Sequence, residues 1–495
     1  MKKIKYLTIA TLFLGTTAFG QGLADAVRLS NYQIQGTARS AAMGNAIGAV
    51  GGDFTSLSVN PAGIGIYQTS EFTFTPTFGF PKAETTIDNR SFSDNDFKLT
   101  FDQLGYVGSV KINESSSSIV RFNYGIGFNK LADFNQSFAG SYGNSPFSFL
   151  DGIADYASNE RLSNNYLDRD FRNIDFRDWH AKLAWETYLI DPATDDLGQI
   201  IDGEYVNILY EGETVDQNKT WERSGRINEY LFSAGLNFNH KFYLGATLGL
   251  HDVFYRQESF YSEQFSDDSF RFTDYYKVTG TGYVFKVGAI IKPVSSVRLG
   301  LAFHTPTYYV LDEENALAMR SYLQESHYAE GINLYEYDFY TPMRTILSGA
   351  FVVNKAAILS FDAEYLDYTA MRFRNGSGGD SMSDLNADID EAFDNTFNYR
   401  LGAEFRVAPS FSLLCGYESY GNPFKNNMNW NEETQTDNIS SFSLGFGYSV
   451  KNFYIDTAFK QYLGKNNLVD PQPNYTSVPV EYTNNELKFT LGFRF

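Results

Sequence analysis

The end of the chain alternates strictly between apolar and polar side chains. From Leu487 to Phe495 every second residue is Leu or Phe, and the positions between them include Lys488 and Arg494. A period of two residues places the two sets on opposite faces of an extended strand. The segment therefore predicts a β-strand with one apolar face and one polar face.

The same alternation recurs upstream over residues 359–365, 399–407 and 442–448, where the polar partners are Gly, Ser or charged residues. Both a soluble sandwich and a membrane barrel use such strands. An Arg at the lipid midplane of a barrel costs about 2–4 kcal/mol, so in a barrel the charged faces must point inward and the aromatic faces outward.

The pattern predicts fourteen strands, an even number. They lie near 71–80, 101–113, 118–134, 228–240, 241–258, 270–290, 296–310, 338–354, 355–372, 394–407, 410–420, 438–449, 452–463 and 483–495.

Short and long connections alternate between these strands. Tight turns are predicted at 239–240, 292–295, 354–355, 408–409 and 451–452, and the other connections are long, apart from a serine-rich turn at Ser115–Ser118. Barrels of the outer membrane have short periplasmic turns and longer extracellular loops. We therefore expect an all-β fold, a 14-stranded antiparallel transmembrane β-barrel in the outer membrane of a Gram-negative bacterium, with both termini periplasmic.

The first twenty residues have the three parts of a secretory signal peptide. Lys2, Lys3 and Lys5 precede an apolar run, and small residues end at Gly20. Cys415 is the only cysteine, so no internal disulfide is expected. A formal net charge of -20 argues against a nucleic-acid partner. We expect a secreted chain that folds by strand pairing and burial.

The largest predicted extracellular loop spans residues 135–227, and we expect helices in it near 149–157 and 181–189. A connection of this length is usually either functional or partly disordered.

Residues 21–70 lack the strand pattern and are rich in small residues, with Met43, Ile47 and Leu57 among them. A barrel of fourteen strands encloses a lumen that its own side chains do not fill. We therefore expect residues 21–70 to form a hatch or plug inside the lumen and residues 71–495 to form the barrel. A loose periplasmic tail is the alternative.

Just before the first strand this segment reaches Asn60, Pro61, Ala62 and Gly63. With its small residues and the strand count, the motif resembles the hatch of the FadL-type long-chain fatty-acid and hydrocarbon transporters. The resemblance implies passive uptake of hydrophobic small molecules, captured at the extracellular side and released sideways past the hatch. It does not place ligand-contacting residues in the barrel.

Charged residues on the polar strand faces are the other site candidates. They are expected to point into the lumen, where they would either line a permeation path or form ion pairs that clamp the hatch. The set is Arg298, Asp362, Glu364, Arg400, Glu404 and Arg406.

Motifs for catalysis or metal binding are not recognisable. The five histidines have no metal-ligand spacing, and no Gly-x-Ser-x-Gly motif occurs. The acidic run between Asp380 and Asp394 lacks the rhythm of a calcium loop. We expect no enzyme, no metal and no cofactor, haem included.

Two functional hypotheses follow. The first is a channel for hydrophobic small molecules, in contact with outer-membrane lipid and lipopolysaccharide. The second is a structural or accessory subunit of an outer-membrane secretion or assembly complex, which the long 135–227 loop favours slightly. A channel predicts a break in strand pairing near the hatch, whereas a scaffold predicts intact pairing and an exposed apolar patch on the loops or outer wall.

Overall fold

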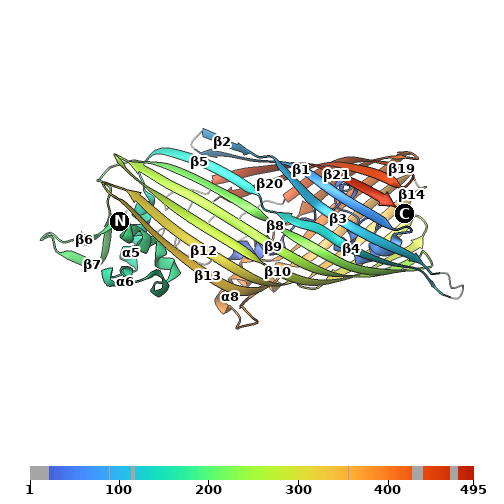
Figure 1. The fold of residues 1–495 in the computed structure, drawn as a ribbon, viewed down its shortest axis with the longest axis horizontal. Coiled ribbons are helices and arrows are strands. Elements are labelled where there is room, and N and C mark those ends of the chain that lie inside the picture. The colour runs from blue at the N-terminus through green and yellow to red at the C-terminus, as the bar shows by residue number, and fades with distance from the viewer. Residues whose placement is uncertain (1–21, 88–89, 113–116, 355, 426–438, 469–477) are drawn as a thin grey trace.

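The computed structural model describes residues 22–87, 90–112, 117–354, 356–425, 439–468 and 478–495, and the predicted signal peptide lies outside them. The chain forms a closed antiparallel barrel (Figure 1). Five of its fourteen transmembrane strands consist of two consecutive elements. The last strand pairs with the first, from Glu71 opposite Arg494 upward, which closes the barrel.

In order around the barrel the strands are β1 (Glu71–Ile87), β2 with β3 (Arg90–Asn95 and Lys98–Lys111), β4 with β5 (Ile119–Asp133 and Gln136–Ser145), β8 (Val215–Phe238), β9 (Phe242–Phe265), β10 (Asp268–Val294), β11 with β12 (Val297–His304 and Tyr308–Tyr322), β13 with β14 (Ser326–Tyr340 and Arg344–Val353), β15 with β16 (Ala357–Asp367 and Arg372–Asn375), β17 (Asn395–Ala408), β18 (Phe411–Tyr420), β19 (Ile439–Val450), β20 (Phe453–Leu468) and β21 (Val478–Arg494).

The predicted number of strands is confirmed, but several strands are longer than predicted. The prediction of 228–240, for example, covers only part of β8. The upper part of β8 carries exposed Glu222 and Arg226 on its outer face, where a membrane strand would carry apolar residues. Because those outer positions are polar, the apolar pattern ends before the hydrogen-bonded ladder does. With β9, β10, β12 and β13 this part of β8 forms a wall of long strands, called the tall wall below. In Figure 1 the barrel lies on its side, and this wall extends to the left.

A belt of exposed apolar side chains surrounds the barrel, as a lipid-facing surface requires. Each of the fourteen strands contributes to it, with Phe72, Leu104, Ile126, Phe232, Leu248, Phe285, Leu301, Leu347, Phe361, Leu401, Leu413, Leu444, Phe459 and Leu491 as examples. The described helices include none long and apolar enough to cross a membrane.

The N-terminal segment contacts buried side chains on the inner faces of several strands. It contains α2 (Leu23–Ser30), α3 (Ala38–Ala42), α4 (Ser56–Val59) and the 3-10 helix η1 (Pro61–Ile66). Helix α3 contacts β18 to β21, and η1 contacts β4 and β8 to β10. The segment therefore touches opposite sides of the barrel.

The largest loop is shorter than predicted, because β5 and the start of β8 occupy the two ends of the predicted range. The loop itself spans residues 146–214. It contains α5 (Phe149–Asn159) and α7 (Trp179–Glu186), close to the two predicted helices, the four-residue α6 (Asn164–Leu167), and the hairpin of β6 (Ile190–Thr194) and β7 (Ile200–Asn207). The 3-10 helices η2 (Phe171–Asn173) and η3 (Phe176–Asp178) complete it.

The loop domain and the tall wall share one hydrophobic core. Leu150, Leu183 and Met319 of that core are fully buried. Burial beside Phe149 lowers the pKa of His180 to about 4, so this histidine is a neutral packing residue rather than a charged one at neutral pH.

A second loop follows β15 and contains the 3-10 helix η4 (Tyr368–Ala370) and α8 (Ser383–Ala392). Ile389 and Phe393 of this loop are fully buried in the same hydrophobic cluster as α2. The acidic run between Asp380 and Asp394 lies here, with Asp384 and Asp388 exposed. Among the residues that the structure describes, no group of His, Cys, Asp or Glu could hold a metal ion.

Candidate functional site

The barrel wall is interrupted between its second and third strands. The ladder between β3 and β4 reaches Gln103 opposite Asn129 and goes no further. Above that pair, residues 98–101 continue to pair with β1, and Lys130, Ala132 and Asp133 continue to pair with β8. Within the described ranges no ladder joins the upper halves of these two strands. The wall therefore has a gap in its strand pairing above Gln103 and Asn129, and β2 and β5 approach each other again beyond it.

Three strands leave regular geometry at the base of this gap. Pro76 of β1 has no backbone N–H to donate to a neighbouring strand. Asp102 is an extra residue in β3, because Thr75 pairs with Gln103 and Pro76 with Phe101. Leu131 is likewise an extra residue in β4 opposite β8. Bulges of this kind bend a strand and redirect its side chains.

The bulges bring charged groups into the wall. Strict alternation would point Asp102 and Lys130 toward lipid, yet both are buried, and their charged groups lie 3.3 Å apart. The side chain of Leu131 is fully buried.

A pocket of about 500 Å³ lies in the gap. Leu99 is the one apolar residue that lines it, and Lys98, Arg223, Asp96 and Glu222 bring two charges of each sign. Thr100, Asn135, Gln136, Ser137 and Ser224 complete the lining. The pocket is therefore polar, with the exposed Leu99 on its β3 side and Glu222, from the part of β8 whose outer face is polar, on the other side.

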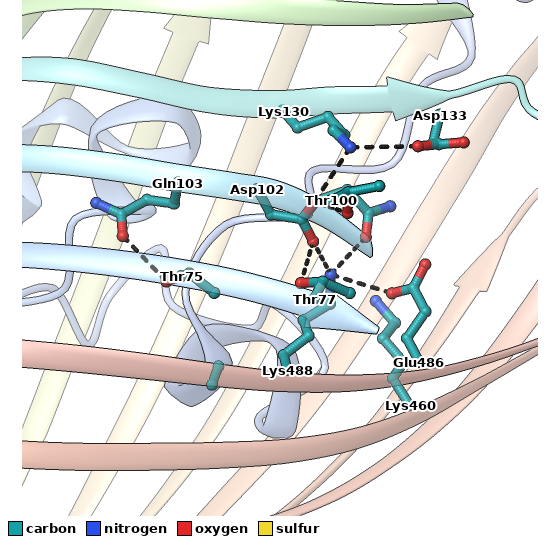
Figure 2. A network of polar contacts seen from close by, with 12 residues as sticks. Thr75, Thr77, Thr100, Asp102, Gln103, Lys130, Asp133, Lys460, Glu486 and Lys488 are labelled. Carbon is teal, nitrogen blue, oxygen red and sulfur yellow. Dashed lines mark hydrogen bonds and ion pairs between the residues drawn. The ribbon is translucent and has the colours of Figure 1, made fainter. Parts of the chain in front are cut away.

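Below the pocket lies a buried polar network (Figure 2). Asp102 accepts hydrogen bonds from Thr77 at 2.6 Å and from Thr100 at 2.9 Å, and it pairs with Lys488. Lys488 also lies 3.0 Å from Glu486.

Lys130 has a second partner in this network, since Asp133 lies 3.2 Å away. Each buried charge at the base of the gap therefore faces an opposite charge, as burial requires.

Gln35 of the N-terminal segment joins this network. Its backbone N–H donates to the carbonyl of Lys130 at 3.0 Å, at the bulge of β4. Its side chain accepts from Lys488 at 2.8 Å and donates to Tyr462 at 3.2 Å. The segment thus contacts the wall on both sides of the gap.

The motif Asn60 to Gly63 lies against β9 and β10, a few strands away from the gap. The Asn60 amide donates to the carbonyl of Gly48 at 2.7 Å, and its oxygen accepts from Ala62 N–H at 3.1 Å, which caps η1. A methyl group at Gly288 of β10 would lie 1.9 Å from that oxygen. Pro61 follows at the first position of η1, and Gly63 lies near Gly51.

We predict that Asn60→Ala loosens residues 44–66 without unfolding the barrel. The change removes the cap of η1 and leaves a buried carbonyl without its donor, a loss of about 1–2 kcal/mol. Hydrogen–deuterium exchange should show faster exchange in residues 44–66 and unchanged exchange in β8 and β9. Unchanged exchange in the segment would contradict this role of Asn60.

Of the six charged candidates, three hold the N-terminal segment. Arg298 donates to the carbonyl of Val50 at 2.5 Å, Asp362 accepts from the N–H of Gly48 at 3.0 Å, and Glu404 pairs with Arg39 at 2.7 Å.

The remaining three differ in position. Glu364 bridges Arg400 and Arg344 at 2.5 and 2.9 Å, and Arg344 also donates to the carbonyl of Ser30. Arg406 continues the same strand face but is exposed near the end of β17, beside an irregularity in the ladder.

The residues of the gap were not among the predicted site residues. Alternation pointed Asp102 and Lys130 outward, and Lys488 lies 386 positions from Asp102. The available local signal was charge at a lipid-facing position, together with Pro76 inside a predicted strand.

No protein-family model matches the chain, and no curated protein matches it in sequence. Among solved structures it is similar to a Pseudomonas aeruginosa FadL homologue, with 12% identity, 94% of this chain and 99% of that chain covered, and a TM-score of 0.53. The chain is also similar to the Pseudomonas putida toluene transporter TodX, with 11% identity, 94% of this chain and 99% of that chain covered, and a TM-score of 0.50. At these identities the comparison establishes the fold.

The barrel, its strand number and its apolar belt agree with that comparison, so the protein is an outer-membrane protein with a FadL-type barrel fold.

Proposed function

We propose that the protein takes up hydrophobic small molecules across the outer membrane and releases them sideways through the gap between β3 and β4. The observation that carries this proposal is the interrupted ladder above Gln103 and Asn129, with a pocket in the gap and Gln35 at its base. A break in pairing near the N-terminal segment is the feature expected of a channel.

The physical advantage of such a route is that the solute does not return to water. Leu99 and Phe101 are exposed on the rim of the gap, so an apolar chain that leaves the pocket meets apolar side chains and lipid. Each Å² of apolar surface kept from water is worth about 25 cal/mol.

The pocket lining supports an amphipathic substrate, of the long-chain fatty-acid type, over a pure hydrocarbon. Lys98 and Arg223 could each give a carboxylate a charge-assisted hydrogen bond. The names of the similar structures include a toluene transporter and a FadL homologue. The polar lining favours a substrate with a charged head group.

In this proposal residues 21–70 act as the hatch. Ala26 and Leu29 of α2 are buried among side chains of the barrel interior, so the segment closes the path in this conformation. Passage would require the part of the segment near Gln35 to move, while the clamps at Gly48 and Val50 hold the remainder.

Native mass spectrometry of the protein, extracted gently from its own outer membrane, tests this proposal. We expect release of an amphipathic small molecule in stoichiometric amount. A fixed set of associated proteins with no small ligand would contradict it and favour the role of a structural or accessory subunit.

A further inference from the structure

The tall wall ends at β13 in a free sheet edge. On one side β13 pairs with β12 over its whole length in continuous register. On the other side it pairs with β16, and that ladder covers only Tyr337–Tyr340. In the part of the chain that the structure describes, no strand pairs with residues 326–335 on that side (Figure 1). The upper part of β13 is therefore the edge of a sheet.

The register identifies the backbone groups that point out of this edge. The N–H and C=O of one residue point to the same side of a strand, and the side alternates from one residue to the next. The carbonyl of Glu336 accepts from the N–H of Gly376 at 3.1 Å, on the side away from β12. Four residues above Glu336 have the same parity, so their N–H and C=O groups also point away from β12. They are Tyr328, Glu330, Ile332 and Leu334.

This edge lacks most of the features that protect sheet edges. Native edges are usually short, bulged, or interrupted by Pro or Lys. Residues 326–335 contain neither Pro nor Lys, and their pairing with β12 has no register shift. None of the outward N–H and C=O groups of these residues has a hydrogen-bond partner among the described residues. Such an edge can bind an extended segment by strand addition.

The side chains beside the edge define what kind of segment fits. Ile332 and Leu334 lie on the outer face and are 56% and 71% exposed. Glu330 and Glu336 are exposed on the same face, one on each side of this apolar pair. Neither of the two carboxylates forms an ion pair with a described residue. The edge therefore carries apolar side chains flanked by negative charge.

We propose that the upper edge of β13 binds an extended segment of a partner protein, which adds a strand to the tall wall. The backbone of the segment would pair with that of Ile332 and Leu334, and its apolar side chains would cover theirs. Lys or Arg two positions further out would face Glu330 and Glu336. The proposal does not depend on the proposed transport function.

Two other occupants fit this edge less well. Lipopolysaccharide has no row of alternating N–H and C=O groups to pair with a strand. A second copy of the chain would have to approach in the same membrane, about a two-fold axis along the membrane normal. Strands of such barrels are tilted by about 35–45°, so the two β13 strands would cross at roughly 70–90°. A ladder cannot form at that angle.

Binding of the labelled peptide Lys-Thr-Leu-Thr-Val-Thr-Lys to the full-length protein in detergent micelles tests this. Its pattern matches the edge in either strand direction, and fluorescence anisotropy should show saturable binding. The matched probes are N-methylated, one at Leu and Val and the other at the two Thr that flank Leu. Because successive N–H groups point to opposite sides of a strand, only one of these probes should lose affinity, by about tenfold or more. Loss with both probes, or with neither, would overturn the proposal.

Ile332→Pro is the corresponding change in the protein. It removes an N–H that points out of the edge and costs no bond of the β12 ladder, so the barrel should still fold. Affinity for the unmethylated peptide should fall by about fivefold to tenfold. Ile332→Thr keeps the N–H and should have a smaller effect. Equal affinities of the proline variant and the wild type would contradict strand addition at this edge.

Charge variants test the flanking carboxylates. Glu330→Gln with Glu336→Gln should weaken binding, whereas Asp196→Asn with Glu211→Gln, both exposed in the loop domain, should leave it unchanged. Equal effects of the two pairs would overturn this part of the proposal. Dimers of the wild-type protein that Ile332→Pro abolishes would assign the edge to a second copy instead. Lipopolysaccharide that displaces the peptide as well as unlabelled peptide does would assign it to lipid.

Discussion

Thr100→Trp or Ser137→Trp will reduce uptake of a labelled long-chain fatty acid to the background of cells without the protein. These residues line the pocket from the two strands that border the gap, Thr100 from β3 and Ser137 from β5. An indole at either position puts a bulky ring into the pocket of about 500 Å³ and replaces a polar lining atom. If solutes leave through the gap, narrowing it slows release, and Ser137→Trp does so without removing the hydrogen bond that Thr100 donates to Asp102.

The matched control is Thr345→Trp. Thr345 lies on the outer face of β14, between Phe303 and Tyr365 in a continuous ladder. There the indole enters the lipid-facing belt, and uptake should remain at the wild-type rate. Normal uptake by both pocket variants would refute lateral exit through this gap, even if the protein binds a fatty acid.

Asp102→Ala will destabilise the barrel more than any comparable change in an exposed ion pair. Asp102 is the shared partner of Lys130 and Lys488, and all three are buried. Removing one member of a buried ionic group leaves a charge without its partner and costs about 3–5 kcal/mol. The retained contacts of Lys130 and Lys488 with Asp133 and Glu486 place the expected loss near the lower end.

Unfolding by urea in detergent micelles measures this loss of stability. The folded fraction is read from the heat-dependent shift in gel migration. Asp96→Ala is the control, since Asp96 lies 4.0 Å from Lys98 with 56% of its side chain exposed, and an exposed pair is worth about 1 kcal/mol or less. Equal midpoints for the two variants would show that the network at the gap contributes no more than a surface pair.

The number of strands was predictable because each transmembrane strand carries its own signal. Alternation within segments such as 399–407 requires only local sequence, and the tight turns divide one segment from the next. The upper parts of β8 and β9 were underestimated because outer positions there are polar above the membrane. Apolar alternation reports the lipid-facing part of a strand and not its full length.

The candidate site was predictable only in part. Asn60 and Pro61 stand out locally, and the structure places them in a capped turn against β10. The gap depends on which residues of β3 and β4 are left unpaired, and the network joins Asp102 to Lys488 across the closure of the barrel. One sequence contains no record of such long-range pairing.

Photo-crosslinking with a long-chain fatty acid that carries a diazirine on its chain tests the central claim most directly. The protein is irradiated in its outer membrane during uptake, and the adducts are mapped by mass spectrometry. We expect adducts concentrated on residues 98–101 and 135–137, the two sides of the gap. Adducts spread evenly over the outer belt, with none enriched at these residues, would contradict release of the substrate through the barrel wall.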